Sequence, residues 1–134
     1  MNNIKSDLYY NDDHTAAAVL VSPGFGAGWS TWNTPELAWR KEIVEFWMAH
    51  REDAAWMHYV EDYGLGNRPG SEAHEEAKKF FQSIGYDEDN CPYFGGFEQI
   101  ELVWVPLNTP WRIEEYDGSE SLVLLENENY TIFN

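Results

Sequence analysis

A glycine-rich loop flanked by tryptophans is the stretch of this sequence best equipped to hold a ligand. It follows an apolar run at residues 16–21 and carries three glycines within five residues. Glycine lets a backbone approach a partner closely, and tryptophan offers a large flat face with one N–H donor. The candidate ligand-binding residues are Gly24, Gly26, Gly28, Trp29, Ser30, Thr31, Trp32 and Asn33.

Two interpretations of this loop stay open. In the first, its polar side chains hydrogen-bond a small nucleotide while Trp29 or Trp32 stacks on the base. The glycine spacing matches neither the Walker motif nor the dinucleotide fingerprint. A phosphate would therefore bind at the N-terminus of the helix that follows Thr34. In the second, both tryptophans belong to the core and the glycines form a structural corner.

Gln99 and Glu101 fall on one face of a predicted strand, because strand side chains alternate. Gln-x-Glu on a strand resembles the catalytic motif of ADP-ribosyltransferases, whose second acid holds the nicotinamide ribose. The next residues, LVWVPLNTPWRI, are similar to the strand–turn–strand that follows that motif. The family's early Arg or His and its Ser-Thr-Ser strand are not identified here, since Ser30-Thr31 lies on a loop. The alternative is a solvated sheet face.

Acidic residues dominate the charge of the chain. The sequence has 24 acidic and 8 basic residues, a formal net charge of −16, and residues 85–134 hold eleven acids against Arg112 alone. Such a charge repels phosphate backbones, which disfavours direct nucleic-acid binding, and attracts basic protein surfaces. Carboxylates spaced along a sheet can imitate a duplex, or simply form a solvated face. The candidate partner-binding residues are Glu114, Glu115, Asp117, Glu120, Glu126 and Glu128.

The sequence offers few residues that are arranged as metal ligands or as catalytic nucleophiles. The four histidines are scattered, and His58 and Asp62, four apart on a predicted helix, supply only two ligands. Cys91 is the single cysteine, which fits a reducing compartment, and it follows acids that disfavour a thiolate. No G-x-S-x-G or H-E-x-x-H motif occurs. We therefore expect no enzyme activity, no metal and no cofactor.

The elements that must position these residues indicate an α+β fold. Thr34-Pro35-Glu36 predicts a helix start, with Thr34 as hydroxyl N-cap, and the helical spacing continues to Met48. Further helices are predicted over residues 54–63 and 72–84. Strands are predicted at 16–22, 97–105, 111–116 and 121–125, with short ones at 8–10 and 130–133, and Asp117-Gly118 signals a tight hairpin. We expect a mainly antiparallel sheet with a C-terminal meander, packed against about three helices.

Length and hydropathy indicate the number of domains and the cellular location of the protein. At 134 residues we expect one domain spanning 1–134. The N-terminus, MNNIKSDLYYNDDH, is polar, and no apolar run reaches the roughly 18 residues of a membrane span. We therefore expect a cytoplasmic protein without a membrane partner.

Most of the chain resembles a known group of proteins. The stretches VLVSPGFGAGWSTWN (19–33) and YFGGFEQIELVWVPLNTPWRIEEYDGSE (93–120) are similar to a widespread, uncharacterised family of short acidic bacteriophage and prophage proteins. ELAWRKEIVEFWMAH and HEEAKKFF resemble that family's helices. The resemblance implies phage infection of a bacterium as the setting. We expect a protein that counters a host defence or regulatory system, either through its acidic surface or by sequestering a nucleotide signal in the glycine–tryptophan loop.

Overall fold

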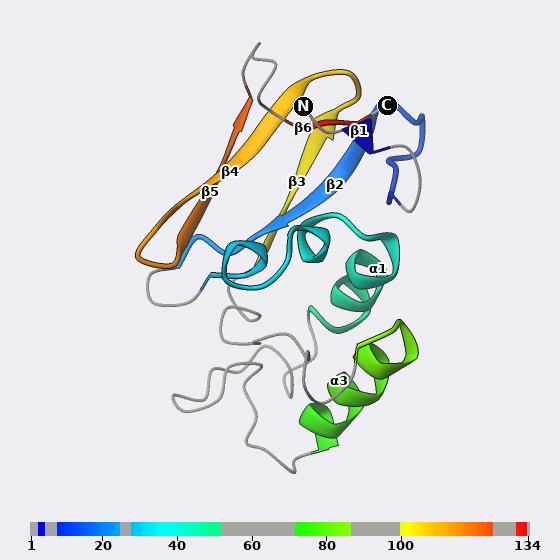
Figure 1. The fold of residues 1–134 in the computed structure, drawn as a ribbon. Helices are drawn as coiled ribbons and strands as arrows, with labels where there is room; N and C mark the ends of the chain where they lie inside the picture. The colour runs from blue at the N-terminus through cyan, green and yellow to red at the C-terminus, as the bar shows by residue number, and fades with distance from the viewer. Residues whose placement is uncertain are drawn as a thin grey trace.

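The fold is a computed structural model that describes residues 3–4, 8–24, 28–51, 72–86, 100–124 and 131–133 (Figure 1). Helices and strands are both present, so the chain is of the mixed α+β class. The elements are, in chain order, β1 (Asn3–Ile4), β2 (Ala16–Val21), the 3₁₀ turns η1 (Ser30–Trp32) and η2 (Pro35–Ala38), α1 (Lys41–His50), α3 (Glu72–Ser83), β3 (Glu101–Pro106), β4 (Pro110–Tyr116), β5 (Ser119–Leu124) and β6 (Thr131–Phe133).

Strand β2 is the middle layer of the molecule, and all six of its residues are buried. Ala18 and Leu20 face the helices, where they join a core that includes Trp29 and Phe81. The alternate residues of β2 face the other way and pack with Trp111 of β4 in a second core. A strand covered on both faces reads as one continuous apolar run, which explains the sequence AAAVLV.

The strands form two sheets rather than one. β2 pairs antiparallel with β3, while the second sheet has the order β1-β6-β4-β5, in which β1 and β6 are parallel and the other pairs antiparallel. The predicted C-terminal meander is therefore not confirmed, because β3 pairs with β2 instead of β4. Alternation along the chain predicts that a segment is a strand, but it does not predict which strand pairs with it. That pairing depends on how the side chains of the two cores pack together.

The first predicted helix is interrupted. Pro35–Ala38 forms only a 3₁₀ turn, and Arg40 is extended, with φ −62° and ψ 128°, before α1 begins. A β-bridge between Leu8 and Arg40 accompanies this break. Thr34 precedes the turn with an extended backbone, but its hydroxyl makes no capping hydrogen bond. The helical spacing was correct for α1, and tertiary pairing decided where that helix starts.

Helix α3 packs on α1 through aromatic rings. Phe46 and Phe80 stack with ring centroids 4.0 Å apart, and Phe81 is buried beneath them. Helix α3 confirms the helix predicted over residues 72–84, whereas the helix predicted over 54–63 lies outside the described residues. In the described part of the chain, no helix has the length and apolar character needed to cross a bilayer.

The β4–β5 hairpin turns at Asp117-Gly118, as the sequence predicts. Both residues have positive φ, 49° and 84°, which is the conformation of a type I′ turn. Six cross-strand pairs follow, from Tyr116↔Ser119 to Trp111↔Leu124. This register puts Trp111, Ile113 and Leu122 on the face that meets β2, and it puts Glu114 and Tyr116 on the opposite face.

Candidate functional site

A buried carboxylate joins the glycine–tryptophan loop to the β4–β5 hairpin. Glu120, on β5, is 1% exposed. Its Oε1 accepts a hydrogen bond from the Ser22 N–H at 2.9 Å, and its Oε2 accepts from the Trp29 N–H at 2.8 Å. The N–H and hydroxyl of Thr31 also donate to Oε2, at 2.9 and 2.6 Å. Hydrogen bonds to an ionised acceptor are about twice as strong as neutral ones, so this cluster is a strong clamp.

The loop can converge on one carboxylate because its backbone folds tightly. A Cβ placed on Gly28 would lie 2.7 Å from Cδ1 of Trp32 and 2.8 Å from the Thr31 hydroxyl, so only glycine fits without displacing them. The Asn33 side chain donates to the Trp29 carbonyl at 2.7 Å and closes the turn. The N–H groups thus form a concave nest for an anion, and the chain itself supplies the anion.

Each predicted loop residue that the structure describes has a definite place. Trp29 is fully buried, and its indole N–H donates to the Leu37 carbonyl at 2.8 Å, as expected for a core residue. Ser30 is also buried, whereas Trp32 is 43% exposed. Gly26 lies outside the described residues. The loop therefore offers solvent one tryptophan, while the N–H groups of Trp29 and Thr31 are already bound to Glu120.

Two further bonds fix the hairpin to the loop. The Glu120 N–H donates to the Ser22 carbonyl at 2.8 Å, and the Ser119 hydroxyl donates to the Pro23 carbonyl at 2.7 Å. The structure thus brings together two stretches that the sequence suggested separately. Glu120 itself was predicted at an acidic surface, and the structure places it in the interior. Its alternation with Leu122 and Leu124 was the available signal for that inner face.

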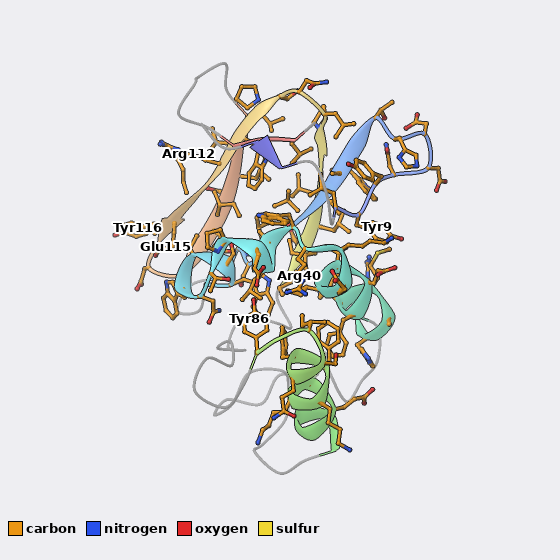
Figure 2. All side chains as sticks on the ribbon, turned by 45° about the vertical axis from the view of Figure 1, so that its right-hand side comes forward. Tyr9, Arg40, Tyr86, Arg112, Glu115 and Tyr116 are labelled. Atoms are coloured by element: carbon orange, nitrogen blue, oxygen red, sulfur yellow. The ribbon has the colours of Figure 1, made fainter. Side chains whose placement is uncertain are left out.

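The remaining described acids of the hairpin do lie at the surface. Glu114, Glu115 and Asp117 are exposed, beside Tyr116 at 78% exposure. Figure 2 shows Glu115 and Tyr116 near the turn of the hairpin and Arg112 farther along β4. Arg112 pairs with Glu114 at 2.6 Å. We call Glu114, Glu115, Tyr116 and Asp117 the acidic tip; predicted residues Glu126 and Glu128 lie outside the described residues.

The outer side of the acidic tip is shallowly hollowed. Glu114, Glu115, Tyr116, Ser119 and Ser121 line an open depression of about 440 Å³. The Gly118 N–H donates to the Glu115 carboxylate at 2.8 Å, which holds one acid against the turn. The surface is thus a small hydroxyl- and carboxylate-rich face around one exposed aromatic ring. Such a face suits contact with cationic groups better than the enclosure of a small molecule.

The motif that resembles an ADP-ribosyltransferase is described only in part. Gln99 lies outside the described residues, and Glu101 is exposed at the start of β3, paired with Val21. In the described part of the chain, no group of histidine, cysteine or acidic side chains could hold a metal ion.

A hydrogen-bonded cluster connects η2, α1 and the end of α3. The Tyr86 hydroxyl donates to the Glu36 carboxylate, and Arg40 lies 3.6 Å from the same carboxylate (Figure 2). Burial, reinforced by the hydrogen bond to Glu36, raises the pKa of Tyr86 to about 12. The hydrogen bond from the backbone N–H of Glu42, with the nearby Arg40 side chain, holds the pKa of Glu42 below its usual range. These contacts orient the elements around Arg40.

The structure also shows a groove that the sequence did not suggest. It lies between α1 and β3 and has a volume of about 500 Å³, with Trp47 and Trp104 among its lining residues. The alternation of β3 placed Trp104 on a face, but nothing local predicted that α1 would leave that face partly uncovered.

Comparison with known proteins assigns no family. The chain matches no protein-family model, no curated protein and no solved structure.

Proposed function

We propose that this chain is a non-enzymatic binding protein whose acidic tip occupies a basic surface of another protein. The observation that carries the proposal is the geometry of the β4–β5 hairpin. It carries three exposed acids and Tyr116 around its turn, and buried Glu120, beside the same turn, fixes that end of the hairpin to the loop. An interface gains from a surface that is already rigid, because less conformational freedom is lost on binding.

The charge of the chain supports a cationic partner. A net charge of −16 attracts basic surfaces over long distances and speeds encounters with them. The exposed aromatic ring of Tyr116 adds a contact of the kind that is enriched in protein interfaces. The resemblance to phage proteins directs this proposal to a host bacterial protein with a nucleic-acid-binding groove, met in the host cytoplasm.

The two alternatives receive less support. A nucleotide bound by the loop N–H groups would have to displace Glu120, a carboxylate that is already tethered to the same fold. Exposed Trp32 remains the feature that favours this alternative. A transferase activity rests on Gln99 and Glu101, and a Glu101→Gln variant that lost labelling of a host protein from NAD would establish it.

A paired-variant capture experiment tests the proposal. The wild-type chain is immobilised and exposed to lysate of a bacterial host, and bound proteins are identified by mass spectrometry at increasing salt. The test variant combines Glu114→Gln, Glu115→Gln and Asp117→Asn, which remove the charge of the acidic tip. We expect a specific host protein to bind the wild type, to leave steeply with salt, and to bind the variant at least about tenfold more weakly.

The matched control removes the same charge elsewhere. Asp12→Asn, Glu45→Gln and Glu76→Gln alter three exposed acids outside the hairpin. If this control loses the partner as strongly as the test variant, only the overall charge matters and the acidic tip is not the site. Binding that does not respond to salt would equally contradict the proposal.

A further inference from the structure

The groove between α1 and β3 is an open hollow lined by both apolar and charged side chains. Residues 47, 48 and 51 line one side of it, and residues 100–102 and 104 line the other. The groove exists because α1 covers β2 with Ile43 and Val44, while part of the helix-facing side of β3 extends beyond it. Its volume of about 500 Å³ falls within the usual range of small-molecule sites.

Aromatic and sulfur-containing side chains are exposed in this groove. Trp104 is 42% exposed and Met48 is 37% exposed, although the opposite face of β3 buries Val105 completely. The Tyr9 ring lies beside Trp104, with centroids 6.2 Å apart and planes tilted by 31°. Because Trp104 is exposed and also lines the groove, its ring offers a surface on which a second flat ring can stack.

A cation lies beside these rings. The Arg51 guanidinium stands over the Trp47 ring, 4.9 Å from its centroid. Among the residues described here, no carboxylate lies within ion-pair distance of Arg51, whereas Arg40 and Arg112 both have such partners. Glu101 also lines the groove, but alternation along β3 directs it away from the face that carries Leu102 and Trp104. Within the described residues, therefore, no carboxylate competes with an external anion for Arg51.

An unused hydrogen-bond donor lies at the same place. Trp47 is 3% exposed, and its indole Nε1 finds no hydrogen-bond acceptor within the part of the chain that is described. Buried donors are nearly always paired, so one without an acceptor calls for a partner. Because Trp47 also lines the groove, a ligand bound there would lie against the indole ring that carries this donor.

We propose that this groove binds a small planar aromatic anion of the mononucleotide class. Its ring stacks on Trp104, and its phosphate pairs with the Arg51 guanidinium. Arginine suits this role because its planar fork matches phosphate oxygens. The site is separate from the acidic tip, so it is independent of the protein–protein function proposed above.

The test uses adenosine monophosphate as the probe and the full chain as the protein. Titration is followed by the indole N–H signals in ¹H–¹⁵N spectra, with the Trp47 and Trp104 signals assigned through Trp→Phe variants. We expect both signals to shift, and we expect adenosine and ribose 5-phosphate to bind more weakly than the intact nucleotide. Trp104→Ala and Arg51→Gln should each weaken binding about tenfold or more, while Trp104→Phe keeps most of it.

A control variant removes a charge outside the groove. Lys79→Gln removes another exposed positive charge. This variant should bind the nucleotide as the wild type does. Equal binding of adenosine and the nucleotide would overturn the role of Arg51. Unmoved Trp47 and Trp104 signals, or wild-type self-association that Trp104→Ala abolishes in sedimentation, would overturn the site.

Discussion

A single carboxylate, that of Glu120, determines which N–H groups of the predicted ligand loop remain free to bind a ligand. Glu120 takes the N–H groups of Ser22, Trp29 and Thr31, and a buried charge is tolerated only where it is well hydrogen-bonded. The side chain therefore serves as an internal ligand of the loop. The position of the Glu120 side chain relative to the loop depends in turn on the register of the hairpin, in which Glu120 pairs with Glu115.

Replacing this carboxylate should destabilise the fold. In Glu120→Gln, one acceptor oxygen becomes an NH₂ group that must face N–H donors, so we expect a loss of about 3 kcal/mol. Urea unfolding followed by tryptophan fluorescence measures the loss. Glu115→Gln, on the paired position, is exposed and keeps an acceptor for Gly118, so it should change stability by less than about 1 kcal/mol. Equal effects of the two variants would contradict the clamp.

At the scale of elements, the Tyr86–Glu36 hydrogen bond joins the end of α3 to η2. These two segments are far apart in the sequence. Helix α3 also contacts α1, through Phe46 and Phe80 and through His50, which lies 3.6 Å from Glu76. The raised pKa of Tyr86 shows that folding favours its neutral form. The contact is therefore a pH-dependent link between elements.

We expect that link to weaken in alkali. Because the pKa of Tyr86 rises from 10 to about 12 on folding, its contribution is complete below pH 10 and declines as the pH rises toward 12. Tyr86→Phe should be about 1 kcal/mol less stable than the wild type near pH 9. This difference should shrink at about pH 11.5. Chemical unfolding of both proteins at the two pH values measures it, and a difference that stays constant would refute the assignment.

At the scale of the whole molecule, β2 is the layer on which everything else is assembled. Helices cover one face, the second sheet covers the other, β3 pairs along one edge, and Tyr10 bridges to Ala17 along the other edge. Solvent thus reaches β2 only if a neighbouring layer moves away. The acidic tip and the groove are built on the outer layers, where local opening requires fewer contacts to break.

Hydrogen exchange should reveal this hierarchy. We expect the amide protons of Ala17–Val21 to exchange most slowly, because their exposure requires nearly global unfolding. Amide protons near the turn of the β4–β5 hairpin should exchange faster. Exchange followed by two-dimensional NMR resolves the individual amides. Faster exchange in β2 than in the hairpin would show that the outer layer is the more stable unit.

The sequence by itself determined features that depend on neighbours along the chain. Alternation and apolar runs located β2, β4 and β5, helical spacing located α3, and Asp117-Gly118 specified the hairpin turn, because backbone sterics act over a few residues. The class of mixed helices and strands followed from these elements. The candidate loop and the acidic hairpin were also visible as separate stretches.

Only the tertiary structure decided which of these residues meet. It placed β3 beside β2, began α1 after Arg40, and buried Glu120 against a loop some ninety residues away. It also left the groove between α1 and β3 partly uncovered. Such outcomes depend on how two cores pack and on which polar groups must be satisfied when they close. A local sequence pattern does not specify these contacts, because the residues that make them lie far apart in the chain.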